Sequence, residues 1–154
     1  MDVPAPTVEE QDRATNTRVI FLCTYNSVRS QMAEAVLRHL AGDRYQVFSA
    51  GITSATVSPR AVAVLEEAGI STQGLYSKSI RQFRGEQFDY VVTVCNDAGR
   101  VCPVLPGGTH HLHHPFPSSP EHGDDEEKVR DEFRRLRDQI TAWVEKTFVR
   151  APKG

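Results

Sequence analysis

Short runs rich in aliphatic, aromatic or β-branched residues recur along the chain and are flanked by turn-forming residues. Such runs are typical of buried strands. A further short and more polar run precedes the C-terminal third of the chain. The predicted strands are residues 18–22, 45–49, 88–94 and, as a short fourth strand, 109–113.

Between and after these strands, apolar residues recur every three or four positions, which predicts helices with one buried face. Ser58 suits an N-cap with Pro59 in the first helical position, and Gly42 and Gly69 mark the ends of two helices. One more helical turn is expected over residues 80–83. The predicted helices are residues 31–41, 59–68 and 124–148.

The buried faces follow from the same spacing. We expect the second helix to bury Val62, Leu65 and Ala68. The last helix carries a longer stripe, formed by Val129, Phe133, Leu136, Ile140, Val144 and Phe148. Strands that alternate with helices predict an α/β fold, a three-layer αβα domain with a four-stranded parallel sheet covered on both faces. Ligands bind such sheets beyond the carboxyl ends of the strands.

Composition fits one globular domain, with 39% hydrophobic residues, 25% charged residues and a net charge of −2. This charge gives no sign of nucleic-acid binding, and no apolar run approaches the roughly 20 residues of a membrane span. Residues 1–17 predict a disordered tail before a single domain at residues 18–150. Because the N-terminus lacks a signal-peptide core, we expect a cytoplasmic protein, and we expect a monomer.

The loop between the first strand and the first helix carries the strongest chemical signal. Cys23 opens it and Arg29 closes it, with five residues between them. Backbone N–H groups at a helix N-terminus and a guanidinium can together wrap one tetrahedral oxyanion, such as phosphate or sulfate. The same groups favour the Cys23 thiolate, which we interpret as a nucleophile. The residues expected to bind the anion are Thr24, Tyr25, Asn26, Ser27, Val28, Arg29 and Ser30.

The other two cysteines, Cys95 and Cys102, lie in a long Gly- and Pro-rich loop after the third strand. An odd number of cysteines in a reducing compartment indicates catalytic or redox use, although a cysteine after a buried strand is often only a small apolar residue. Cys23 and Cys95 both follow the carboxyl ends of strands, where they can share one site. Seven residues of loop also allow Cys95 and Cys102 to approach for a disulfide.

Several segments carry a resemblance to a known family. They are Cys23-Thr24-x-Asn26-Ser27-x-Arg29-Ser30-Gln31-Met32-Ala33-Glu34, Ser49-Ala50-Gly51, Val91-Val92-Thr93-Val94-Cys95 and Cys102-Pro103. Together they make residues 18–148 similar to the thioredoxin-coupled arsenate reductases of the low-molecular-weight tyrosine phosphatase superfamily. The resemblance implies a flavodoxin-like topology, arsenate as the substrate, thioredoxin as the partner and a role in arsenic detoxification.

The resemblance also implies a relay of three thiols. Cys23 attacks arsenic, Cys95 attacks the Cys23 sulfur, and arsenite leaves with two electrons. Cys102 then attacks Cys95, and the resulting Cys95–Cys102 disulfide is reduced by thioredoxin. The sequence itself shows three cysteines at suitable places.

One departure from the family pattern lies near Ser118. Phosphatases and many reductases of the superfamily carry an Asp-Pro pair there, and its Asp protonates the leaving group. This chain has no Asp-Pro pair, and we place Ser118 at the acid's position. A serine is no general acid near neutral pH, so phosphatase activity is expected to be weak.

A second departure concerns a cation. In related arsenate reductases, positions matching Asn26, Glu34 and Ser49 lie near a structural potassium ion, with an Asp where this chain has Lys78. A lysine ammonium can replace such an ion, so we expect no metal and no other cofactor. A solvated Lys78 is the plainer interpretation. The remaining cluster is interpreted as strand-end and loop histidines without zinc, His110, His111, His113, His114 and His122.

Three other functions stay open on the sequence. A low-molecular-weight tyrosine phosphatase would share the loop but lacks the acid and carries an unneeded cysteine pair. A redox-sensing or arsenic-binding protein would use three thiols but leaves Arg29 unexplained, because neutral arsenite needs no guanidinium. A single-thiol reductase is disfavoured by Cys95 and Cys102.

Overall fold

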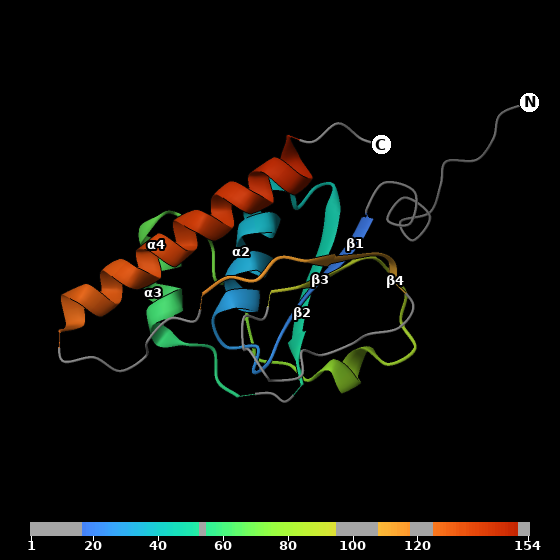
Figure 1. Ribbon diagram of the computed structural model, residues 1–154, viewed down its shortest axis with the longest axis horizontal. Coiled ribbons are helices and arrows are strands. Elements are labelled where there is room, and N and C mark those ends of the chain that lie inside the picture. The colour runs from blue at the N-terminus through green and yellow to red at the C-terminus, as the bar shows by residue number, and fades with distance from the viewer. Residues whose placement is uncertain (1–16, 53–54, 95–107, 118–124, 151–154) are drawn as a thin grey trace, which may run out of the picture.

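The computed structural model describes residues 17–52, 55–94, 108–117 and 125–150, and all structural statements concern these residues. Strands and helices alternate along most of this length (Figure 1). The strands are β1 (Thr17–Cys23), β2 (Tyr45–Gly51), β3 (Phe88–Thr93) and β4 (Gly108–His113). The helices are α2 (Arg29–Ala41), α3 (Pro59–Glu67), the 3-10 helix η1 (Ile80–Phe83), α4 (Glu126–Val144) and the π turn η2 (Glu145–Val149).

The four strands form one sheet in the order β2-β1-β3-β4, and every neighbouring pair is parallel. The chain runs from β1 to β2 on one side and then returns past β1 to β3. This reversal is the topological switch point of a flavodoxin-like sheet, and ligands bind beyond the strand ends there. Cys23 is the last residue of β1 and lies at that point. The predicted α/β fold with a four-stranded parallel sheet is confirmed.

The two faces of the sheet are covered differently. Val19 and Phe21 of β1 pack with α2, α3 and α4 in the larger core, and Figure 1 shows α4 crossing over α2 with α3 beside it. Ile20 and Leu22 point to the opposite face, where Phe83 of η1 joins a smaller core. Within the described residues, the second outer layer is therefore the short η1 and not a long helix.

Helix α4 follows its sequence pattern closely. All six residues of the predicted stripe are buried, five of them in α4 and the last, Phe148, in the π turn η2. Asp125 caps the helix by accepting hydrogen bonds from the backbone N–H groups of Glu127 and Lys128. The Phe148 ring lies edge-on to Phe21, with ring centroids 6.1 Å apart. The amphipathic stripe thus anchors the C-terminal helix to α2 and the first strand.

Two details of the predicted elements were wrong. Helix α3 begins at Pro59 with Ser58 as its N-cap, as expected, but it buries Ala61, Val64 and Leu65. Val62 is only partly buried and Ala68 is exposed. Thr17, assigned to the tail, belongs to β1, while residues 1–16 lie outside the described part. In the described ranges, no helix has the length and apolarity that crossing a bilayer requires.

Candidate active site

The loop of residues 23–30 links the end of β1 to the first turn of α2, which begins at Arg29. The Cys23 side chain is buried, with 2% of its surface exposed. Its Sγ lies 2.8 Å from Ser30 Oγ and accepts a hydrogen bond from the Asn26 backbone N–H at 3.2 Å. The sulfur therefore lies inside the curve of the loop, facing two polar groups that stabilise a negative charge.

The backbone carbonyl groups of the five residues in the middle of the loop accept hydrogen bonds from outside it. The acceptors are Thr24, Tyr25, Asn26, Ser27 and Val28, and the donors, in that order, are Ile52 N, Ser77 Oγ, Gln31 Nε2, Ser58 N and Met32 N. No described peptide bond is cis, and in a trans peptide the N–H points away from the C=O. The N–H groups of residues 25–29 are therefore turned toward the inner side, where an oxyanion can accept from them.

Asn26 fixes the conformation of the loop. Its φ of +53° lies in the left-handed region, which asparagine tolerates better than most residues. Its Oδ1 accepts from the Lys78 backbone N–H at 2.7 Å and from Gln31 Nε2 at 2.8 Å. Its Nδ2 donates to Ser30 Oγ at 2.7 Å and to Ser49 Oγ at 2.9 Å. Because Oδ1 faces two donors, the reversed amide would be mismatched, and the side chain has one orientation.

Arg29 closes the loop and is largely buried. One of its guanidinium nitrogens, Nη1, donates to the Phe116 carbonyl oxygen at 3.3 Å. Phe116 is buried in the segment that follows β4, two residues before position 118. The segment that leads toward Ser118 therefore contacts the same loop as Cys23.

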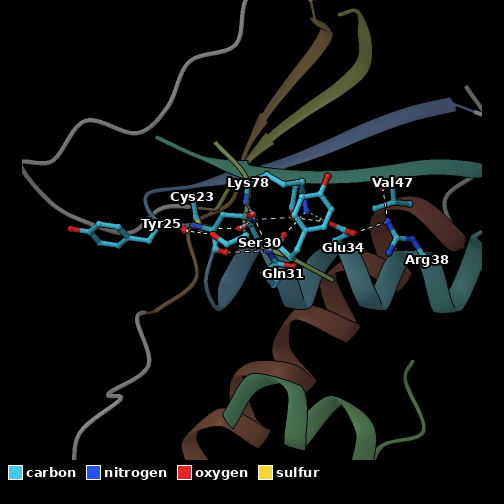
Figure 2. Close-up of polar contacts among 12 residues, drawn as sticks. Cys23, Tyr25, Ser30, Gln31, Glu34, Arg38, Val47 and Lys78 are labelled. Carbon is cyan, nitrogen blue, oxygen red and sulfur yellow. Dashed lines mark hydrogen bonds and ion pairs between the residues drawn. The ribbon is translucent and has the colours of Figure 1, made fainter. Parts of the chain in front are cut away.

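Behind the loop, the buried Glu34 carboxylate contacts one hydroxyl group and two cationic side chains. Ser49 Oγ donates to Glu34 Oε1 at 2.5 Å, and Arg38 Nη2 lies 2.6 Å from Glu34 Oε2. Lys78 Nζ lies 3.4 Å from Glu34 Oε1 and donates to the Tyr76 carbonyl oxygen at 2.7 Å. Burial lowers the pKa of Lys78, and the charge of Glu34 opposes that shift. Figure 2 shows these contacts running from Cys23 along α2 to Arg38.

The positions implied for a potassium ion include Lys78, which brings a positive charge of its own. The Lys78 ammonium lies against the Glu34 carboxylate and the Tyr76 carbonyl oxygen, and only 4% of Lys78 is exposed. The ammonium therefore already occupies these two oxygens. Elsewhere in the described part of the chain, no three His, Cys, Asp or Glu side chains are grouped as metal ligands.

The loop residues predicted to bind the anion do not all direct their side chains inward. Tyr25 is 48% exposed, and its ring points away from the other labelled residues in Figure 2. Ser27 Oγ donates outward to the Thr56 carbonyl oxygen at 2.7 Å. These two residues can serve an anion through their backbone N–H groups, whereas Cys23 and Ser30 contribute side chains.

Three candidate residues, Cys95, Cys102 and Ser118, lie outside the described residues. The neighbour of Cys95 is described, however. The Val94 backbone N–H donates to the Leu22 carbonyl oxygen at 2.9 Å, so the chain leaves β3 beside the end of β1.

Sequence reasoning missed Arg38 and Tyr76. Arg38 follows Glu34 by four residues on one helix, a spacing that favours an ion pair and that was open to detection. Tyr76 contributes through its backbone carbonyl, which accepts from Lys78 and from Gln31 Nε2. Side-chain identity carries no signal for such a contact.

Comparison with known proteins places this geometry in a family context. The family model described as low molecular weight phosphotyrosine protein phosphatase matches residues 18–151. The arsenate reductase of Halalkalibacterium halodurans is 43% identical over 141 residues, which cover 90% of this chain and 99% of that protein.

Solved structures agree with this. An arsenate reductase in the phosphate binding state matches with a TM-score of 0.67 and 30% identity, covering 84% of this chain and 94% of that one. A thioredoxin-dependent arsenate reductase from Corynebacterium glutamicum matches with a TM-score of 0.57 and 29% identity, covering 89% of this chain and 66% of that one.

Proposed function

The chain belongs to the low molecular weight phosphotyrosine protein phosphatase family, and we propose that it acts there as an arsenate reductase regenerated by thioredoxin. One observation carries the proposal: the Cys23 sulfur accepts from the Asn26 N–H within a loop whose carbonyl groups at residues 24–28 are bonded to groups outside it. The similarity to proteins named arsenate reductase selects arsenate among the tetrahedral oxyanions that such a loop accepts.

In the proposed first step, the loop N–H groups and Arg29 bind arsenate through its oxygens. The Cys23 thiolate attacks arsenic, and one oxygen leaves as water after taking up protons. The product is a covalent Cys23–S–As(V) adduct. Ser30 supports this step because its Oγ lies 2.8 Å from the sulfur. A hydroxyl that donates to a thiolate stabilises its negative charge.

In the second step, the Cys95 thiolate attacks the Cys23 sulfur. The S–As bond breaks, its electron pair stays on arsenic, and arsenite leaves as As(III). A Cys23–Cys95 disulfide results. The contact between Val94 and Leu22 supports this step, because it brings the chain entering Cys95 beside the strand that ends in Cys23.

In the third step, Cys102 attacks Cys95 and frees Cys23. An external dithiol then reduces the Cys95–Cys102 disulfide, and thioredoxin is the donor we propose. The thioredoxin-dependent arsenate reductase of Corynebacterium glutamicum, similar over most of this chain, supports that choice. The reaction would serve arsenic detoxification in the cytoplasm.

Phosphatase activity is the disfavoured alternative. The chain has Pro115-Phe116-Pro117-Ser118 where the family carries an Asp-Pro pair, and it has no Asp-Pro elsewhere. Aryl phosphate hydrolysis gains about 10²–10⁴-fold from a general acid that protonates the leaving group. With Ser118 at that position, we expect hydrolysis to be slow.

The proposed function is tested by quantifying arsenite and aryl phosphate hydrolysis on one sample. With arsenate, thioredoxin, thioredoxin reductase and NADPH, the wild type should form arsenite continuously. The Cys23→Ser variant, matched in size, should lower that rate at least about a thousandfold. Rapid aryl phosphate hydrolysis without arsenite would instead identify a phosphatase.

A further inference from the structure

Lys78 is a buried cation to which the arsenate chemistry assigns no part. It lies in the segment between α3 and η1, and 4% of its surface is exposed. An ammonium group removed from water is costly unless it is paired and hydrogen-bonded. Its surroundings therefore indicate what it does.

Lys78 contacts the loop's supporting network at two points. Its backbone N–H donates to Asn26 Oδ1 at 2.7 Å. Its Nζ lies 3.4 Å from Glu34 Oε1, 2.7 Å from the Tyr76 carbonyl oxygen and 4.4 Å from the centre of the Tyr76 ring. The carboxylate, the carbonyl oxygen and the ring face all attract a positive charge.

The hydrogen bonds that start at Glu34 have a fixed direction. An ionised Glu34 only accepts, so the Ser49 hydroxyl must donate to it. Ser49 Oγ then accepts from Asn26 Nδ2, whose second N–H donates to Ser30 Oγ. The Ser30 hydroxyl proton remains to point at the Cys23 sulfur, 2.8 Å away.

Two cations contact the Glu34 carboxylate. Arg38 contacts Glu34 from the outer side, and its side chain is 44% exposed. Lys78 contacts Glu34 from the inner side, and its side chain is 5% exposed.

We propose that Lys78 is a positioning residue whose ammonium serves as a resident cation: it pairs with the buried Glu34 carboxylate, and through Ser49 and Asn26 it holds the anion loop without a monovalent metal ion. The inference deepens the proposed function, since it concerns the same loop. Its test, however, measures anion binding and thermal stability, and neither measurement depends on whether the protein reduces arsenate.

The test measures binding of inorganic phosphate by calorimetry, and the melting temperature, in potassium, ammonium and choline chloride at matched ionic strength. Wild-type values should be the same in all three salts. Lys78→Ala opens space beside Glu34, and in choline it should weaken phosphate binding about tenfold, a modest coupling between sites. Potassium or ammonium should restore most of that loss by occupying the space.

Two further variants sharpen the test. Lys78→Met fills the space with an uncharged chain, so it should weaken binding similarly and show no rescue by potassium. Lys128→Ala removes an exposed lysine of α4 and should match the wild type.

Three results would overturn the inference. The wild type could gain affinity or melting temperature specifically in potassium. Lys78→Ala could bind phosphate as tightly as the wild type in choline. Lys78→Ala could also lose phosphate binding with no restoration by potassium or ammonium, which would assign Lys78 to packing alone.

Discussion

Two carboxylates in the described part of the molecule each meet two cationic side chains, in different surroundings. Glu34 contacts Arg38 at 2.6 Å and Lys78 at 3.4 Å, and its side chain is 3% exposed. Glu67 on α3 contacts Arg134 at 2.6 Å and Arg137 at 3.0 Å on α4, and its side chain is 36% exposed.

The two ion-pair clusters differ in the effect of removing one charged side chain. Around Glu67, water replaces a lost partner, and exposed ion pairs contribute little to stability. Around Glu34, water has little access, and a lost carboxylate leaves a charged lysine without its partner. Glu34 is also bonded, through Ser49, to the loop that holds Cys23, whereas Glu67 joins two helices at the surface. Similar ion pairs can therefore serve an active site or only a surface.

The largest effect is expected from Glu34→Gln, which keeps the shape and removes the charge. We expect a loss of about 3 kcal/mol in the free energy of unfolding, the low end for breaking a buried pair, because Arg38 can turn to solvent. Phosphate binding should weaken as well, since Ser49 loses its ionised acceptor. Thermal or denaturant unfolding and calorimetry measure the two quantities.

The pH dependence of that loss gives a sharper check. Burial lowers the pKa of Lys78, while Glu34 raises it, so the Gln variant should lower it further. Arg38, the other charged group beside Lys78, acts in the lowering direction. A folded-state pKa below the unfolded value makes stability rise with pH between the two. The difference in the free energy of unfolding between the wild type and Glu34→Gln should therefore become smaller at alkaline pH. If this difference stayed constant up to pH 10, the charge of Lys78 would not be the cause of the loss in stability.

The smallest effect is expected from Glu67→Gln. Hydrogen bonds from Arg134, chiefly, and then from Arg137 lower the pKa of Glu67 to about 2, but the carboxyl is partly exposed and screened by solvent and salt. With its folded pKa depressed, any contribution is present above the unfolded pKa of 4.5 and is lost as pH falls toward about 2. From pH 6 to 9 the melting temperature should change by about 2 °C or less, with unchanged phosphate binding. If Glu67→Gln lost as much stability as Glu34→Gln, the buried and the exposed ion pairs would not differ in the way described.

The fold was predictable where hydrophobic spacing was unambiguous. The stripe from Val129 to Phe148 extends over more than five turns of helix pattern, and every member is buried. The face of α3 was not predictable, because residues 61–65 are all apolar and leave the phase of a nine-residue helix undetermined. Alternation of strands and helices predicted a parallel sheet, whereas the strand order β2-β1-β3-β4 was suggested only by the flavodoxin-like topology that the family resemblance implies.

The candidate site was predictable in part. The spacing of Cys23 and Arg29 between a strand and a helix indicated an anion loop, and the structure places Cys23 at the end of β1 and Arg29 at the start of α2. The outward hydrogen bonds to the loop carbonyls come from residues such as Ile52 and Ser77, on segments that carry no pattern. The contact between Lys78 and Glu34 joins residues 44 positions apart, and only the family resemblance suggested it.

The central claim, a thiol relay that reduces arsenate, is tested most directly with Cys102→Ser. Supplied with arsenate and thioredoxin, this variant should release about one arsenite per chain and then stop, with Cys23 joined to Cys95 in a disulfide that mass spectrometry identifies. Continuous arsenite formation by the variant would contradict the relay, and so would the absence of any arsenite release.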